Sequence, residues 1–177
     1  ALRDHSMQLD CDMLRDAADR IARAIPMVKE CMTLEELRGI EGEAASSYFG
    51  VFDSLILQNK KDFFWRGRSR RPPTDNLNAL LSFYYSLLMN DCTSALEAVG
   101  LDSYAGFLHR DRPGRRSLAL DLMEEFRAPV CDRFVLSLIN TRQIDGSGFL
   151  HKENQAVIMD DNTRRKFLAA WQKRKQE

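Results

Sequence analysis

The chain has 177 residues and equal numbers of positive and negative side chains, with 26 Lys and Arg against 26 Asp and Glu. This length can bury one good hydrophobic core, and the balanced charge excludes a protein whose whole surface attracts polyanions. Any polyanion site must therefore be local. Four widely spaced cysteines, with no signal peptide or long apolar span, predict a cytoplasmic protein without membrane association.

Apolar residues recur at helical spacing through most of the chain, which predicts a mainly α-helical, multi-helix fold. A glycine and two prolines exclude a continuous helix from 65 to 73, and Pro129 predicts a further break. Turn residues between short apolar runs from 146 to 158 predict a small β-hairpin near the C-terminus. In chain order, the expected helices cover about residues 10–30 with a kink at Pro26, 41–58, Thr74 or Asp75 to near Gly100, 117–127, the stretch after Pro129 to about Asn140, and Asp161 or Thr163 onward.

Two clusters of arginines lie in predicted loops, where guanidinium groups can bind phosphate oxygens bidentately. This pattern indicates contact with nucleic acid. The alternative is a pair of solvated loops whose arginines pair with acids such as Asp62, Asp75 and Asp111. The first cluster contains Arg66, Arg68, Arg70 and Arg71, and the second contains Arg110, Arg112, Arg115 and Arg116.

Three acids lie close together on the predicted helix after the second cluster. Asp121 lies opposite the apolar stripe of that helix, with Glu124 and Glu125 to either side. Asp121 could share a cation with Glu124 or with Glu125, and spacing does not decide between them. The alternative is the solvated outer face of an amphipathic helix.

Two further residues could join such a site. His109 ends an apolar run directly before the second arginine cluster, so it could be a metal ligand or a hydrogen-bonded structural residue. Glu41 lies among glycines and alanines that would allow a close backbone approach. The alternative for Glu41 and Glu43 is a favourable interaction with a helix dipole.

Taken together, four motifs closely resemble the CRISPR-associated spacer integrase family, in that family's order and over about residues 38–140. They are Gly39-Ile40-Glu41-Gly42, the arginine-rich loop ending Pro72-Pro73 before Asp75-Asn76-Leu77-Asn78, Gly106-Phe107-Leu108-His109, and the run from Asp121 to Arg127. The loop Arg110-Asp111-Arg112-Pro113-Gly114 and the run Leu122-Met123-Glu124-Glu125-Phe126-Arg127 most resemble family members from type I-C and related systems.

The resemblance implies one helical catalytic domain over residues 1–177 that binds Mn²⁺ or Mg²⁺. Position by position, the ligands are Glu41, His109 and Glu124, and Asp121 is the neighbouring acid of the catalytic site. Many family members have aspartate where this chain has Glu124, which bears on the reach of that ligand.

The resemblance also implies a function: a metal-dependent DNA endonuclease and integrase that inserts short foreign DNA into a CRISPR array by 3′-hydroxyl attack on a phosphodiester. Its partners would be double-stranded DNA with 3′-hydroxyl ends, CRISPR repeat DNA, a second copy of the chain, and a small ferredoxin-like nuclease. The family's β-rich N-terminal domain and its extreme C-terminus are expected to be missing, so we expect this chain to be a fragment. The alternative function is a non-catalytic helical DNA-binding or adaptor module.

Overall fold

The computed structural model describes residues 11–110 and 112–176, so Asp111 lies outside the described residues. The chain forms two compact units. Unit 1 comprises Ala1–Leu57 with Trp65–Gly67, and unit 2 comprises Gln58–Phe64 with Arg68–Glu177. The expectation of one domain over residues 1–177 stays a prediction.

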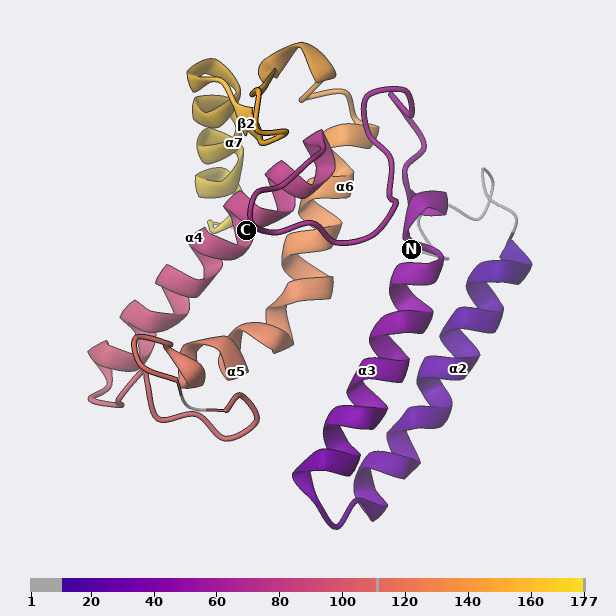
Figure 1. Ribbon diagram of the computed structural model, residues 1–177, viewed down its shortest axis with the longest axis vertical. Coiled ribbons are helices and arrows are strands. Elements are labelled where there is room, and N and C mark those ends of the chain that lie inside the picture. The colour runs from indigo at the N-terminus through magenta and orange to yellow at the C-terminus, as the bar shows by residue number, and fades with distance from the viewer. Residues whose placement is uncertain (1–10, 111, 177) are drawn as a thin grey trace. The chain divides into compact units, whose positions relative to one another are not determined.

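Unit 1 is built on a hairpin of two helices, α2 (Cys11–Glu30) and α3 (Leu34–Gly50) (Figure 1). Thr33 begins α3 with a capping box, in which its side chain accepts from the backbone N–H of Glu36 at 3.2 Å and the Glu36 carboxylate accepts from the backbone N–H of Thr33. The predicted extension of this helix to residue 58 is wrong, because α3 ends at Gly50.

A short 3₁₀ turn, Phe52–Leu55, replaces the rest of that predicted helix. The turn buries Phe52 and Leu55 in the same unit. Phe49 stacks on Trp65 with ring centroids 5.0 Å apart, and the backbone N–H of Trp65 donates to Asp53 at 2.7 Å. Packing against Trp65, which is distant in sequence, therefore accompanies the early helix end.

Unit 2 is organised around the long helix α4 (Asn76–Ala98). Asp75 caps it by accepting from the backbone N–H of Asn78 at 2.7 Å, and Gly100 follows its end with a positive φ of 79°. The sequence prediction for this helix is confirmed. Tyr84 on α4 packs edge-on against aromatic rings of two other helices, which places the core of unit 2 beside α4.

The helix after the second arginine cluster does not break at Pro129, so that prediction is wrong. α5 (Ser117–Phe126) continues through a π-helical turn, Arg127–Asp132, into α6 (Arg133–Asn140). A π turn adds a residue to the helical turn, which widens the helix where the proline ring lacks an N–H donor. The chain therefore keeps one continuous helical path from α5 to α6.

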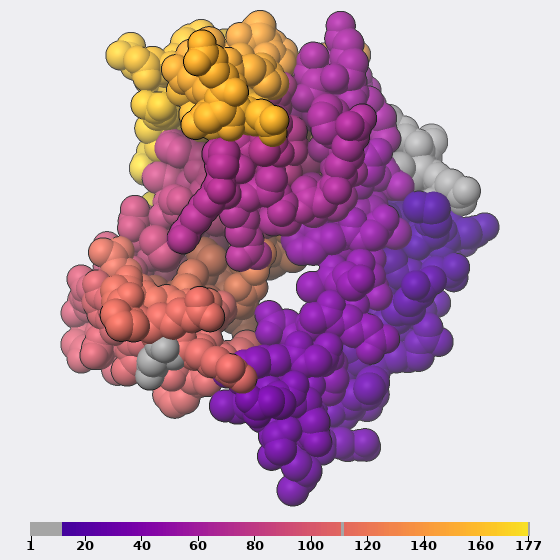
Figure 2. Space-filling model, viewed as in Figure 1, coloured from indigo at the N-terminus to yellow at the C-terminus, as the bar shows by residue number. Residues whose placement is uncertain are grey.

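The C-terminal part of unit 2 contains the predicted β-hairpin, with β1 (Phe149–His151) antiparallel to β2 (Val157–Met159). Helix α7 (Asp161–Arg174) follows. Figures 1 and 2 show the hairpin and α7, in orange to yellow, at one end of α4, and the segment around α5 at its other end. The mainly α-helical fold is confirmed. Among the helices that the structure describes, none has the length and apolar character needed to cross a bilayer.

Candidate functional site

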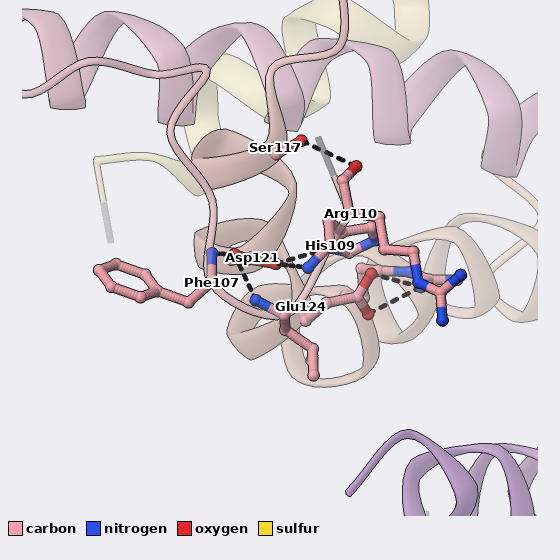
Figure 3. A network of polar contacts seen from close by, with 8 residues as sticks. Phe107, His109, Arg110, Ser117, Asp121 and Glu124 are labelled. Carbon is pink, nitrogen blue, oxygen red and sulfur yellow. Dashed lines mark hydrogen bonds and ion pairs between the residues drawn. The ribbon is translucent and has the colours of Figure 1, made fainter. Parts of the chain in front are cut away.

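The loop that carries His109 is fastened to α5 by a single carboxylate. Oδ2 of Asp121 accepts from the backbone N–H groups of Phe107 at 2.6 Å and Leu108 at 3.0 Å, and Oδ1 accepts from that of His109 at 2.9 Å (Figure 3). Three successive amides thus converge on one acid. This arrangement fixes the backbone beside the candidate ligand.

Gly106 allows the loop to approach α5 this closely. A Cβ atom at position 106 would lie 2.5 Å from Cβ of Ser117 and 3.0 Å from Oδ2 of Asp121. Real side chains do not tolerate the first distance, so a larger residue would move the loop away from the carboxylate. The Gly-Phe-Leu-His motif therefore has a steric reason for its glycine.

The same carboxylate orients the imidazole ring. Nδ1 of His109 lies 2.6 Å from Oδ1 of Asp121, and the ring nitrogen is the donor because a carboxylate can only accept. This leaves Nε2 as the ring nitrogen able to bind a metal ion. Metal-binding histidines usually donate their other ring N–H to a carboxylate in this way.

These contacts change the protonation of Asp121. Burial by itself would raise the pKa of Asp121, but the hydrogen bonds from the His109 ring and from the three backbone amides lower it below its ordinary value. The acid is therefore held ionised at neutral pH. Its negative charge also favours a cation bound to the adjacent imidazole.

Glu124 lies one turn beyond Asp121 on α5 and has a different partner. Nη1 of Arg127 donates to both of its carboxylate oxygens, at 2.8 and 2.7 Å. The side chain of Glu124 is 26% exposed and that of Arg127 is 21% exposed. Glu125 is exposed. Glu124 and Glu125 are equally possible partners of Asp121 by spacing alone, but their surroundings in the structure differ.

Arg127 also connects Glu124 to the core of unit 2. Its guanidinium carbon lies 4.8 Å from the centre of the Tyr85 ring, and the Tyr85 hydroxyl donates a very short hydrogen bond to Asp132, which is 1% exposed. Burial raises the pKa of Tyr85, and the charge of Asp132 raises it further. The hydroxyl therefore stays protonated as the donor.

The sequence patterns indicate no functional role for Tyr85, Asp132 or Arg127. The i, i+3 spacing of Glu124 and Arg127 is a signal that could have indicated the ion pair. Nothing local indicates that the Tyr85 ring lies beside them, because α4 and α5 are far apart in sequence.

Glu41 belongs to unit 1, where it is exposed on α3. His109, Asp121 and Glu124 belong to unit 2, so a site that includes Glu41 stays a prediction. Within the described ranges, 11–110 and 112–176, no three His, Cys, Asp or Glu side chains form a metal-binding group. The donor set itself, mainly carboxylate oxygens with one imidazole, suits Mn²⁺ or Mg²⁺.

The first arginine cluster is not uniform. Nη1 of Arg68 donates to Oδ1 of Asn78 at 2.8 Å, and Nη2 donates to Oγ of Ser82 at 3.0 Å. Burial lowers the pKa of this guanidinium. These acceptors turn both terminal nitrogens of the guanidinium toward α4, and contact of Arg68 with phosphate stays a prediction. Arg66, Arg70 and Arg71 are exposed, and their contact with DNA stays a prediction.

The second cluster follows His109 in the chain, before α5 begins. Arg110 and Arg112 are exposed, whereas Arg115 and Arg116 are half-buried. Nη1 of Arg116 donates to Oδ1 of Asn90 on α4 at 3.2 Å. Four positive charges thus lie within seven residues after His109 in sequence. Their contact with DNA stays a prediction.

Comparisons with known proteins agree with the resemblance in the sequence. The family described as "CRISPR associated protein Cas1" matches residues 1–173. A curated relative from Rhodospirillum rubrum, "CRISPR-associated endonuclease Cas1 2", is 53% identical over 100% of this chain and 53% of its own length. The chain spans about half the length of the curated relatives it matches.

Solved structures have the same fold. A CAS1 protein from Thermotoga maritima aligns with a TM-score of 0.79 and 34% identity over 92% of this chain and 52% of its own. A structure titled "Casposase bound to integration product" aligns with a TM-score of 0.73 and 29% identity over 91% of this chain and 48% of its own. The family match, which covers nearly the whole chain, shows that this chain belongs to the Cas1 family of CRISPR-associated proteins.

Proposed function

We propose that this chain is the catalytic part of a metal-dependent DNA endonuclease and integrase that inserts short foreign DNA fragments into a CRISPR array. The observation that carries the proposal is the His109–Asp121 pair, in which the carboxylate holds Nδ1 and leaves Nε2 for a metal ion. Family membership supports the same reaction class, as does the likeness to a casposase whose title names an integration product.

Glu41, His109 and Glu124 are the residues that would hold Mn²⁺ or Mg²⁺, with Asp121 orienting the histidine. The bound ion would supply a Lewis acid beside the phosphodiester. Asp121 keeps His109 in one tautomer and one orientation through the contacts at 2.6 and 2.9 Å. The chain's own contribution at this point is a preorganised ligand.

The proposed reaction exchanges one ester bond for another. The 3′-hydroxyl oxygen of a short DNA fragment forms a bond to a phosphorus of the repeat, and the bond from that phosphorus to the repeat's own 3′-oxygen breaks. The attacking hydroxyl loses a proton and the leaving oxygen gains one. No nucleotide cofactor is needed, because the number of phosphodiester bonds is unchanged.

DNA would be held by the exposed arginines without reading of base sequence. Arg110 follows His109 directly in sequence and Arg112 comes two positions later, so a phosphate bound there would lie near the ring. Arg115, Arg116, Arg66, Arg70 and Arg71 would add charge along the backbone.

The partners that we propose are double-stranded DNA with 3′-hydroxyl ends, CRISPR repeat DNA, a second copy of the chain, and a small ferredoxin-like nuclease. These partners belong to the whole protein, since this chain covers about half of its curated relatives. We propose action in the prokaryotic cytoplasm, where the DNA array lies.

Strand joining in the presence of Mn²⁺ tests this proposal. A labelled DNA fragment with a free 3′-hydroxyl and a target containing a repeat should give a branched product, whereas a fragment with a 3′-deoxy end should not. Glu41→Ala, His109→Ala and Glu124→Ala should each abolish joining while the helical circular-dichroism spectrum is retained. Glu43→Ala and Glu125→Ala are matched controls, because both acids are exposed neighbours of proposed ligands.

Three results would contradict the proposal. Full activity in all three ligand variants would remove these residues from the reaction. DNA binding without any metal-dependent cleavage or joining would favour a non-catalytic DNA-binding or adaptor module. Degradation of DNA without joining would favour a general metal nuclease.

A further inference from the structure

Arg127 occupies the position on Glu124 that a chelating cation would take. A single guanidinium nitrogen, Nη1, lies 2.8 Å from one carboxylate oxygen and 2.7 Å from the other. A divalent ion bound through both oxygens would need the same place. Burial by itself would lower the pKa of Arg127, but the charge of Glu124 raises it, so the guanidinium is a permanent cation.

We propose that Arg127 is the resident counter-cation of this site, that a divalent metal ion displaces it from Glu124, and that the released guanidinium binds a DNA phosphate. Since Glu124 is taken here as a metal ligand, this inference rests on the proposed function. The Glu124 carboxylate would exchange Arg127 for the metal ion.

The contacts of Arg127 suit an exchange. The side chain is partly exposed, at 21%, so its tip can reach solvent without unfolding of the helix. Its Nε atom is buried without a hydrogen-bond partner, which means that the present position leaves one donor unsatisfied. The guanidinium carbon lies 4.8 Å from the centre of the Tyr85 ring, and a side-chain hydrogen bond to the Tyr85 hydroxyl also helps to raise the pKa of Arg127, so release gives up these contacts together with the ion pair.

Tyr85 and Glu124 both have other partners when Arg127 leaves. Tyr85 keeps its hydrogen bond to Asp132 and its contact with the Arg68 guanidinium, whose carbon lies 5.4 Å from the ring centre. Glu124 receives the charge of the metal ion in place of that of Arg127. The ring beneath Arg127 can therefore stay in place during the exchange.

The exchange predicts that metal and DNA bind cooperatively. With no phosphate present, a metal ion must displace Arg127 and is repelled by it at short range. With phosphate present, the released guanidinium gains a new partner, so each ligand favours binding of the other. Removal of the Arg127 charge should remove this coupling.

Mn²⁺ affinity, measured by electron paramagnetic resonance of the free ion, tests the exchange without any catalytic readout. Arg127→Gln should bind Mn²⁺ on the order of tenfold more tightly than the wild-type protein when DNA is absent. A short DNA duplex should tighten Mn²⁺ binding several-fold in the wild-type protein and have no such effect in Arg127→Gln. Arg127→Met serves as a second variant that keeps a long side chain over Tyr85.

Arg164→Gln is the matched control, because Arg164 pairs with Asp161 at the same i, i+3 spacing on α7. It should leave Mn²⁺ affinity and its response to DNA unchanged. Unchanged or weaker Mn²⁺ binding in folded Arg127→Gln and Arg127→Met would overturn the exchange.

Glu124→Gln separates this inference from the proposed function. Loss of Mn²⁺ binding in Glu124→Gln, with no effect of Arg127→Gln on Mn²⁺ affinity, would contradict the exchange but support Glu124 as a metal ligand. Unchanged Mn²⁺ binding in Glu124→Gln would remove Glu124 as a ligand, and the exchange would fail with it. Absence of Mn²⁺ binding to the wild-type protein would overturn both.

Discussion

Asp121 and Glu124 lie one turn apart on α5, yet their charges are balanced in different ways. Asp121 accepts from three backbone amides and one ring nitrogen, all of them fixed by the fold. Glu124 is balanced by one long, partly exposed arginine side chain. Asp121 therefore stabilises the His109 loop, whereas Glu124 can exchange its partner. A ligand and the residue that orients a ligand need these two different kinds of environment.

The largest effect is expected from Asp121→Asn. The new amide nitrogen would face two of the four donors that Asp121 accepts, so we expect a loss of about 3 kcal/mol in the free energy of unfolding. Urea unfolding measures this loss. Glu125→Gln, at an exposed position of the same helix, is the control and should change stability by less than about 0.5 kcal/mol. Asp121→Asn with wild-type stability would remove the distinction between the two acids.

The pH dependence of stability should show the same contrast. The pKa of Asp121 is lowered in the folded state, so its contribution is complete above the pKa of the unfolded chain and is lost as pH falls through the folded value. The stability difference between wild type and Asp121→Asn should therefore be largest near neutral pH and shrink below about pH 4. Urea unfolding at several pH values measures it. A difference that grows toward acid pH would reverse the assigned sign.

Tyr85→Phe tests the support beneath Arg127 and should have an intermediate effect. The ring remains beside the guanidinium, but the buried Asp132 loses the hydroxyl donor and Arg127 loses a hydrogen bond, which should lower the free energy of unfolding by about 1–2 kcal/mol. Thermal unfolding followed by circular dichroism can measure it, with Tyr104→Phe at an exposed position as the control. Equal stability of Tyr85→Phe and wild type would show that the hydroxyl contributes nothing to this network.

Glu124→Gln should have the smallest effect on stability and a large one on activity. A partly exposed ion pair contributes about 0.2–1 kcal/mol, so unfolding should change by no more than that. Strand joining should nevertheless fall by more than the roughly 10- to 100-fold typical of losing an outer partner of a metal ligand. Urea unfolding and the joining assay, run on the same preparation, compare the two. Strong destabilisation by Glu124→Gln would place Glu124 in the same structural class as Asp121.

Much of the fold could be predicted from sequence because its signals are local. The apolar spacing and the Asp75 cap predict α4, and the turn residues from 146 to 158 predict the β-hairpin, since each depends on neighbours within a few residues. The early end of α3 at Gly50 was missed because it coincides with packing of Phe49 on Trp65, sixteen positions away.

The candidate site also combines features that are visible in the sequence with contacts that form only on folding. The sequence establishes that a histidine, a group of acids and two arginine clusters are present, and its four motifs indicate the family. The packing of the folded chain shows that Asp121 holds the His109 loop, that Arg68 turns inward to α4, and that Arg127 lies between Glu124 and Tyr85. Spacing along one helix limits which side chains share a face, whereas their partners come from segments that only packing brings near.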